Sequence, residues 1–388
     1  MAEKNDRLYS LDALRGFDMF FISGGDTIFI ALAAILPFQP FAWWGEQMDH
    51  VQWDGFKAFD LIFPLFLFMA GVSFAFSLQK RSETNQSDAQ IYKHIFKRAF
   101  LLVLLGIISN GFLSKLNLVD FRYASVLGRI GLAWMFAALI VMKANWRWQI
   151  AWVVAVLLGY WAILASFTAP DVDTLLIPDK LRENMPPEIL NAVGNYSLRG
   201  NISGYIDRLF LPGNFWLKIF DPEGYLGIIP ATATALLGAL TGRFLMIEMP
   251  RFSKQKKGFM LALAGVLLIV LGWIWDLGFP VNKNLWSSSF VCVAGGWSLV
   301  LLSIFYLIID VYGFKKWSFF FKIIGVNSIA AYMIPTFINL RYTNKAIFGG
   351  ISNYLSEDYS KLLFGFGHVV ILWLILYLMY RQKWFLKV

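Results

Sequence analysis

Ten stretches of this chain are long and apolar enough to cross a lipid bilayer. A spanning helix needs about 20 mostly apolar residues, because the hydrocarbon core is about 30 Å thick and each residue adds about 1.5 Å. Of the 388 residues, 58% are hydrophobic and only 15% are charged, well below the charge of a typical soluble domain. We predict an all-α polytopic membrane protein, a single domain over 1–388, with about ten transmembrane helices near 12–36, 58–78, 99–114, 124–142, 148–167, 224–242, 258–275, 288–310, 318–337 and 363–380.

The positions of lysine and arginine predict the orientation, because positively charged loops stay on the cytoplasmic side. If the N-terminus is inside, that side holds most of these residues, with dense groups at 80–98 and 251–257. Both termini are therefore expected inside, in a multi-pass protein of the cytoplasmic (inner) membrane. The net charge of +9 is interpreted as this loop charge and not as a nucleic-acid-binding surface. The first apolar run is too long for the core of a signal peptide and is expected to stay as a span.

One connection is long enough to form a small subdomain outside the membrane. The segment 168–223 contains Pro170, Pro178, Pro186 and Pro187, which favour turns and short helices. The orientation places it on the non-cytoplasmic side. The small residues of IPATATALLGALTG, at 229–242, are expected to let helices pack closely.

The first span is unusual because it carries Asp12, Arg15, Asp18 and Asp26. Ionisable groups at membrane depth are costly and usually face a cavity or a partner. In a regular α-helix the 11-residue step from Arg15 to Asp26 returns to the same face, about 16 Å along the axis. These residues predict either a polar stripe that lines a passage or a buried ion pair with an interfacial acid at each end.

His50 is the histidine that the predicted topology places beside the outer end of this span. An imidazole titrates near neutral pH, so a positioned histidine can take a proton from an amine or be acylated itself. The acids that could orient its ring are Asp26, Asp49, Asp54 and Asp60. A structural role at the interface, beside Trp53, is the alternative.

Other polar residues fall in predicted spans, namely Arg129, Lys322, Asn327 and Ser328. Such side chains either belong to a site or only join helices by hydrogen bonds. The single cysteine, Cys292, excludes an internal disulfide. We find no phosphate-binding glycine loop, zinc-binding helix or dinucleotide fingerprint, and GGD at 24–26 is expected inside a helix, so no metal and no nicotinamide cofactor is predicted.

Four blocks of the sequence resemble the heparan-α-glucosaminide N-acetyltransferase family of transmembrane acyltransferases and its bacterial relatives. They are RLYSLDALRGFDMF at 7–20, HVQWDGFKAFDLIFPLFLFMAGVS at 50–73, DPEGYLGIIPATATALLGALTG at 221–242, and NKNLWSSSFV at 282–291 followed by GVNSIAAYM at 325–333. The blocks occur in family order over nearly the whole chain.

The resemblance implies a membrane enzyme that moves acetyl from cytoplasmic acetyl-CoA to an amino sugar on the opposite face. The family's catalytic histidine corresponds to His50, as general base or acetyl carrier. The family commonly has an asparagine eleven residues after the arginine of its RG motif, where this chain has Asp26.

On this basis we predict three groups of site residues. The catalytic group is His50, Asp26 and Asp60; the group that binds acetyl-CoA is Arg7, Asp12, Arg15, Arg129, Asn327 and Ser328; the group that binds the acceptor is Trp53, Asp54, Asn284 and Trp286. The expected partners are acetyl-CoA, an amino sugar or glycan and the lipid bilayer, with no nucleic acid and with a homodimer as an open option. The alternatives are an O-acyltransferase of envelope polysaccharide and a transporter of a sugar or lipid precursor.

Overall fold

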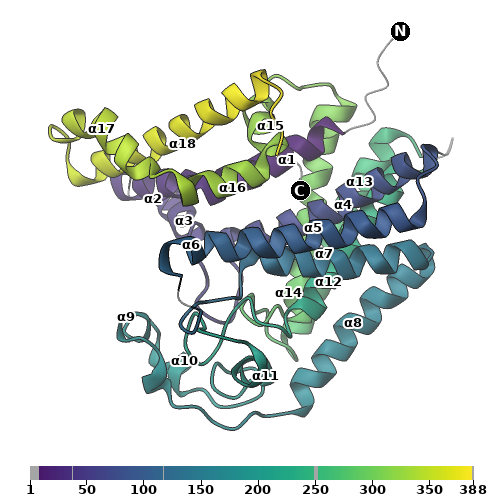
Figure 1. Cartoon of the computed structure of the whole chain (residues 1–388), viewed down its shortest axis with the longest axis horizontal. Coiled ribbons are helices and arrows are strands. Elements are labelled where there is room, and N and C mark those ends of the chain that lie inside the picture. The colour runs from purple at the N-terminus through teal and green to yellow at the C-terminus, as the bar shows by residue number, and fades with distance from the viewer. Residues whose placement is uncertain (1–7, 37, 117, 249–251, 387–388) are drawn as a thin grey trace.

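The computed structural model describes residues 8–36, 38–116, 118–248 and 252–386, and in these residues the chain is helical and has no strand. Figure 1 shows the arrangement. The long helices are α4 (Ile62–Glu83), α5 (Asp88–Ser109), α7 (Val126–Lys143), α8 (Trp146–Ser166), α12 (Ile228–Met246), α13 (Lys254–Asp276), α14 (Ser288–Phe305) and α18 (Glu357–Arg381). The shorter ones are α1 (Tyr9–Phe20), α2 (Asp26–Ile35), α3 (Gln39–Gln47), α6 (Phe112–Lys115), α9 (Asp179–Arg182), α10 (Pro187–Asn191), α11 (Ile202–Phe210), α15 (Phe319–Val326), α16 (Ser328–Phe337) and α17 (Leu340–Ser352).

The prediction of an all-α polytopic membrane protein is confirmed. Among the described residues, eight helices are long and apolar enough to span a membrane, or nine if α15 and α16, which meet at 70°, form one broken span. The tenth expected span, 99–114, differs. Residues 99–109 belong to α5, and residues 112–114 belong to the short helix α6. Helix α5 starts at Asp88 and carries Lys93, Lys97 and Arg98, so it has too many charges to qualify as a span on composition.

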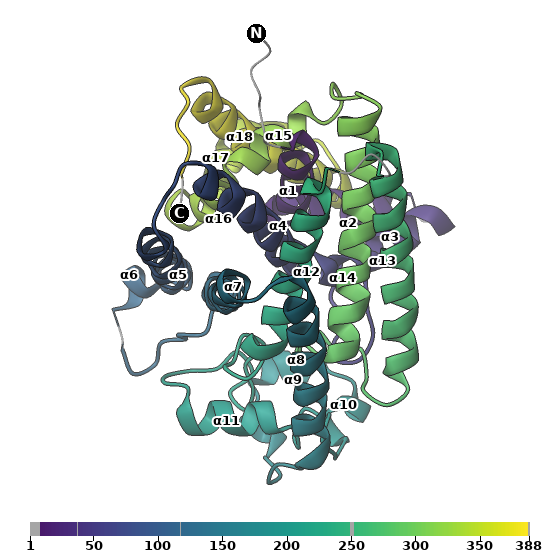
Figure 2. The same cartoon turned by 90° about the vertical axis from the view of Figure 1, so that its right-hand side faces the viewer.

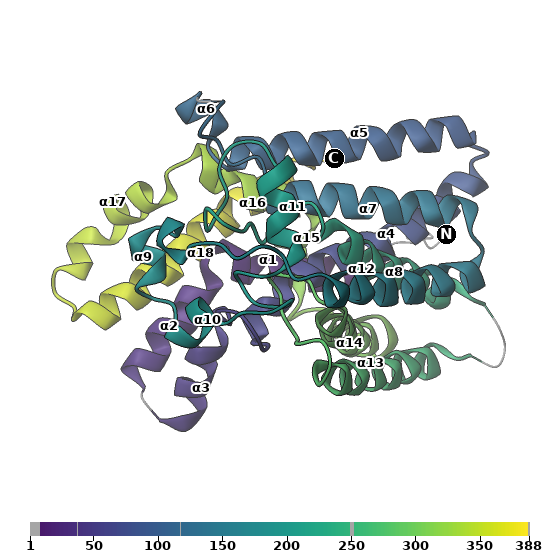
Figure 3. The same ribbon diagram turned by 90° about the horizontal axis from the view of Figure 1, so that it is seen from below.

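Two groups of helices lie side by side. In Figure 1, α1, α2 and α15–α18 form the upper left part, and α4, α5, α7, α8 and α12–α14 form the larger bundle. Figure 3 shows the helices of the bundle running roughly parallel to one another. Within the bundle, α4 and α12 approach closely, because a Cβ on Gly238 would lie 2.0 Å from the carbonyl oxygen of Phe68. This contact confirms the packing role expected for the small residues of 229–242.

The first span is broken, which corrects the expectation of one regular helix through GGD. Residues Phe21–Gly25 form a π-helical turn between α1 and α2, and Gly24 has φ of 99°, a left-handed conformation that favours glycine. A Cβ on Gly24 would lie 3.1 Å from Cδ2 of His368, so α18 packs against the break. Arg15 and Asp26 therefore do not lie on one continuous helix face.

The second break lies at Asn327, between α15 and α16. Its side-chain amide donates to the carbonyl oxygen of Trp384, and its side-chain oxygen accepts from the backbone N–H of Leu386. Asn327 thus ties the break to the C-terminal segment. Broken helices inside a membrane occur where the freed backbone lines a cavity or is buried in protein.

The long connection after α8 packs at one end of the bundle, where α9, α10 and α11 lie together at the bottom of Figure 2. It has a core of its own that includes Leu198, Ile219 and Phe220. Tyr160 of α8 and Phe279 join this core from the bundle. The connections that carry His50, Arg122 and residues 277–287 lie at the same end, since all of them contact this segment or one another.

Candidate functional site

His50 and Asp60 form a hydrogen-bonded pair at this end of the bundle. His50 follows α3, and Asp60 lies in the 3-10 turn Ala58–Leu61 that leads into α4. The distance from Nδ1 of His50 to Oδ1 of Asp60 is 2.8 Å. The Asp60 side chain is fully buried, whereas 49% of the His50 side chain is exposed. The pair therefore joins a fixed acid to an accessible imidazole.

The donors around Asp60 determine which nitrogen of His50 carries the proton. Oδ2 of Asp60 accepts from the backbone N–H groups of Val51, at 3.3 Å, and Lys57, at 3.1 Å. A carboxyl group surrounded by donors acts as an ionised acceptor, so Nδ1 of His50 donates to it and Nε2 keeps its lone pair. This is the arrangement that a general base or an imidazole nucleophile requires.

Lys283 is a third member of the site that the sequence analysis did not select. Its Nζ lies 3.2 Å from Nε2 of His50, 2.9 Å from Nδ1 and 3.3 Å from Oδ1 of Asp60. Burial lowers the pKa of the Lys283 ammonium, while the charges of Asp60 and Glu223 act in the opposite direction. The sequence offered one indication of this role. Lys283 is a cation in a short connection on the predicted non-cytoplasmic side, where lysine and arginine are few.

The backbone around Lys283 is held in place by several hydrogen bonds. The N–H of Trp286 donates to the carbonyl of Lys283, and Trp286 has φ of 53°. The side chain of Asn282 accepts from the N–H of Leu285 and donates to Oδ1 of Asp54. This turn fixes the backbone of Lys283 near the start of α4, so the lysine ammonium lies beside His50 and Asp60.

A cavity of about 250 Å³ opens beside these residues, between the two helix groups. Among the residues that the structure describes, the basic and carboxylic side chains that line it are His50, Lys283 and Glu223. Its other walls are largely apolar and come from α1, α4, α7, α16 and the short turns Phe21–Gly25 and Ala58–Leu61. The residues are Met19, Ile22, Phe59, Ile62, Phe63, Phe66, Val126, Leu127, Ile130, Ser328, Ile329 and Tyr332. A few polar groups in an apolar pocket are typical of a small-molecule site.

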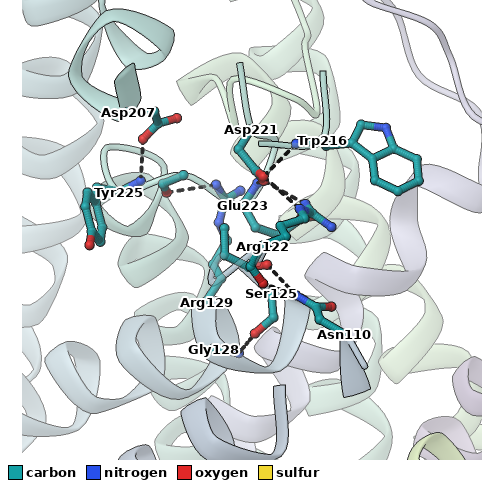
Figure 4. A network of polar contacts seen from close by, with 12 residues as sticks. Asn110, Arg122, Ser125, Gly128, Arg129, Asp207, Trp216, Asp221, Glu223 and Tyr225 are labelled. Carbon is teal, nitrogen blue, oxygen red and sulfur yellow. Dashed lines mark hydrogen bonds and ion pairs between the residues drawn. The ribbon is translucent and has the colours of Figure 1, made fainter. Parts of the chain in front are cut away.

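Glu223 connects this cavity to a second polar network, drawn in Figure 4. Nε and Nη2 of Arg122 each donate to Asp221 over 2.7 Å, and Nη2 also contacts Glu223. Burial opposes the charge of Arg122, but its bonds to Asp221 and the charge of Glu223 outweigh it and raise the pKa of the guanidinium. The network therefore holds the segment of Asp221 and Glu223, which precedes α12, against the connection of Arg122, which precedes α7.

Arg129, predicted to bind acetyl-CoA, belongs to this network. It is labelled in Figure 4, is 3% exposed, and its Nη2 donates to the carbonyl of Gly224 over 3.2 Å. Its guanidinium lies over the ring of Trp286. Trp286, predicted to bind the acceptor, is also buried and donates to Oγ1 of Thr234. Both side chains support the walls of the site from behind.

The other three predicted acceptor residues, Trp53, Asp54 and Asn284, lie in the connections beside His50 and Lys283 and have different surroundings. Trp53 is buried and donates to the carbonyl of Tyr196, so it anchors the subdomain of the long connection. Asp54 is exposed, and Asn284 donates to the carbonyl of Gln52. Asp26 lies near enough to His50 to interact with it electrostatically.

A second group of charged residues lies further along α1, away from His50. Nη2 of Arg15 donates to Oγ of Ser73 over 2.5 Å, and its Nη1 lies 3.5 Å from Asp12. Arg98 of α5 interacts electrostatically with Arg15 and lies 4.3 Å over the ring of Trp134. Met19 and Ile22 line the cavity and follow Arg15 by one to two helical turns, about 6–10 Å along the axis. Arg7 lies outside the described residues.

One unsatisfied donor near Arg15 fits an anionic ligand. Nε of Arg98 is buried and makes no hydrogen bond to the described residues. The two carboxyl oxygens of Asp18 are also buried and unsatisfied, but they are acceptors, which a phosphate would not satisfy. Two neighbouring guanidinium groups are a common arrangement for binding phosphate.

The two remaining residues predicted to bind acetyl-CoA have different positions. Ser328 lines the cavity, while Asn327 joins the helix break to the C-terminal segment. No group of three or more histidine, cysteine or acidic side chains in the described residues is placed to hold a metal.

Comparison with known proteins gives two curated relatives, while no family model matches the chain. Heparan-alpha-glucosaminide N-acetyltransferase of Mus musculus is 28% identical over 328 residues, which cover 73% of this chain and 48% of that protein. The protein of the same name from Homo sapiens is 27% identical over 370 residues, 84% of this chain and 52% of that protein. The chain thus spans about half the length of these relatives, and the matches support its membership of their family.

Proposed function

We propose that this member of the heparan-alpha-glucosaminide N-acetyltransferase family is a multi-pass membrane enzyme that transfers acetyl from acetyl-CoA to the amine of a glucosamine-type sugar. The observation that carries the proposal is the pair of His50 and Asp60, 2.8 Å apart at the edge of the cavity. The similarity to two acetyltransferases over most of the chain supports the reaction class.

His50 is proposed to act through Nε2, which the bond from Nδ1 to Asp60 leaves with its lone pair. In one route Nε2 accepts the proton of the acceptor amine as that amine attacks the thioester. In the other, Nε2 first takes the acetyl group and then passes it to the amine. The geometry serves both routes, since both use the same nitrogen.

The donor is proposed to lie along α1. Its phosphates would meet Arg15 and Arg98, with Asp12 and Ser73 orienting Arg15. The pantetheine arm would then run towards the cavity past Met19 and Ile22 and bring the thioester to His50. Arg129 and Asn327 are proposed to support this path rather than to contact the donor, because their side chains are bonded to backbone groups.

The acceptor is proposed to enter from the side of the long connection, over Asp54 and Asn284, with Asp26 as a further acid that interacts with His50. Both termini and the Arg15 end would face the cytoplasm of a cell whose inner membrane holds the protein. The direction of transfer is then from the cytoplasmic face to the opposite one.

The test is vectorial transfer in sealed proteoliposomes. Radiolabelled acetyl-CoA is supplied on one side only and glucosamine on the other, and the product is identified as the N-acetyl or O-acetyl derivative. The proposal predicts labelled N-acetylglucosamine on the side of the acceptor, with none from His50→Ala. The control is His94→Ala, since His94 lies on α5 and lines no part of the cavity. Transfer by His50→Ala at the wild-type rate, or uptake of glucosamine without acetylation, would contradict the proposal.

A further inference from the structure

The ammonium of Lys283 lies within hydrogen-bond distance of the site's base and its acid at once. Nζ is 2.9 Å from Nδ1 of His50, 3.2 Å from Nε2 and 3.3 Å from Oδ1 of Asp60. Lys283 is 233 positions from His50 in the sequence, and the turn Lys283–Trp286 brings the lysine there. The ammonium is thus within reach of both ring nitrogens and of the carboxylate, so its N–H donors lie beside the nitrogen that the reaction uses.

The charge arrangement keeps Lys283 in the site. The Asp60 carboxylate accepts from it, and Glu223 on the cavity wall adds a second negative charge nearby. Only 20% of the Lys283 side chain is exposed, and the remaining cavity walls are largely apolar. In such surroundings a cation interacts more strongly with a nearby negative charge than it would in water.

Acyl transfer produces a negative charge at one defined place. When a nucleophile attacks the thioester carbonyl, the π electrons of the C=O bond move to oxygen and form an oxyanion. Enzymes stabilise this charge with fixed donors directed at the oxygen. A nucleophile bound at Nε2 of His50 puts the carbonyl carbon next to it, and the neighbouring donor in the described part of the cavity is the ammonium of Lys283.

Resting on the proposed function, we propose that Lys283 is a catalytic residue that donates a hydrogen bond to the acyl oxygen of the donor and to the oxyanion formed from it. An ammonium has three N–H donors. One remains on Asp60, and the donor that lies near Nε2 turns to the acyl oxygen when the acceptor amine takes its place.

In the direct route the amine nitrogen forms a bond to the carbonyl carbon, the oxyanion accepts from Lys283, and Nε2 of His50 takes one proton from the amine. The oxyanion then re-forms the C=O bond, the carbon–sulfur bond breaks, and the CoA thiolate receives the proton from His50. In the acetyl-histidine route the same oxygen carries the charge in each half-reaction, so Lys283 has the same role.

Two unreactive CoA analogues test the contact with the acyl oxygen directly. Acetonyl-CoA keeps the carbonyl but replaces the cleavable thioester with a ketone, and S-ethyl-CoA has no carbonyl. We expect the wild type to bind acetonyl-CoA about tenfold more tightly than S-ethyl-CoA, since a hydrogen bond from a charged group is worth roughly that factor or more. In Lys283→Met this ratio should fall to about one, while S-ethyl-CoA binding is retained.

Kinetics give the second readout. Loss of one oxyanion donor should lower kcat by about 100- to 1,000-fold with little change in KM for acetyl-CoA. Lys283→Arg keeps the charge and donors and should retain part of the ratio, so it serves if the methionine variant does not fold. The control is Lys218→Met, because Lys218 lies in the long connection and contacts Asn214.

The outcomes separate this proposal from the one it rests on. If both analogues bind and their ratio is the same in the wild type, Lys283→Met and Lys283→Arg, Lys283 does not contact the acyl oxygen and this proposal fails alone. If neither analogue binds to the wild type, the proposed function fails and the role of Lys283 fails with it.

Discussion

Nδ1 of His50 lies 2.8 Å from Oδ1 of Asp60, and the carboxylate that holds this half-exposed imidazole is itself completely buried. Backbone N–H groups of Val51 and Lys57 fix the other carboxyl oxygen. The acid is thus positioned by the main chain, and the ring is positioned by the acid. These contacts hold Nδ1 on the carboxylate and leave Nε2 as the ring nitrogen that is not bonded to it.

Asp60→Asn tests this positioning. The amide keeps the shape of the carboxyl group but loses the charge that favours the proton on Nδ1, so Nε2 becomes a poorer base. We expect kcat for acetyl transfer to fall by about 100-fold or more, which is the usual size of a general-base contribution. Asp49→Asn is the matched control, because the Asp49 carboxylate accepts from the backbone N–H of His50 and not from its ring. Equal effects of the two changes would refute the role of Asp60.

Arg15→Gln tests the proposed donor site. Removal of one charge-assisted contact to phosphate should weaken acetyl-CoA binding by about tenfold or more. Titration calorimetry in detergent measures it, and the affinity of the wild type should fall more steeply with salt than that of the variant. Arg147→Gln is the control, since Arg147 lies over the ring of Trp146 at the start of α8 and contacts neither Ser73 nor Arg98 in the described structure. An unchanged affinity in Arg15→Gln would place the phosphates elsewhere.

Arg122→Met tests the network that holds the long connection. The change leaves Asp221 buried without its cation, and losing one partner of a buried pair is strongly destabilising. We expect the free energy of unfolding to fall by on the order of 3 kcal/mol, measured by denaturation in detergent. Arg199→Met, which removes a pair with the exposed Asp171, should have little effect. A small effect at Arg122 would mean that the network does not anchor this segment.

Asp207 predicts a pH dependence of stability. Burial raises the pKa of this carboxyl to about 7, although the N–H of Tyr225 donates to it. Its ordinary value is about 3.9. Between these values the folded chain binds more protons than the unfolded chain, so this group makes the protein less stable as the pH rises from about 4 to about 7.

Asp207→Asn removes that penalty. Relative to the wild type, the variant should gain melting temperature at pH 8 and gain less, or nothing, at pH 4.5. Thermal denaturation of both proteins in the same detergent at the two pH values measures the difference. A gain that does not depend on pH would show that Asp207 is not protonated in the folded protein.

The sequence predicted the helices better than their interruptions. Apolar length locates spans reliably because the bilayer sets it, and eight helices match expected spans. The breaks at Gly24 and Asn327 depend on partners distant in sequence, His368 and Trp384, which periodicity cannot reveal. The start of the span in α5 was also ambiguous from the sequence, because the basic end of a helix can lie either inside the lipid or outside it.

The candidate site was predictable in part. Asp60 was one of four acids near His50 in the sequence, and only the 3-10 turn at the start of α4 shows which of them reaches the ring. Lys283 and Arg98 were missed because their neighbours come from other helices, and a lone cation in a connection or at a helix boundary has no distinctive spacing. Arg129 and Trp286 were selected for their polarity or position and turn out to be bonded within the protein.

The most direct test of the account is acetyl transfer by purified protein, with His50→Ala compared with His94→Ala under single-turnover conditions. Radiolabelled acetyl-CoA and glucosamine are mixed with each variant after its binding of acetyl-CoA has been verified. The account predicts labelled N-acetylglucosamine from the wild type and His94→Ala, and none from His50→Ala despite retained donor binding. Labelled product from His50→Ala at the rate of the wild type would contradict the central role given to His50.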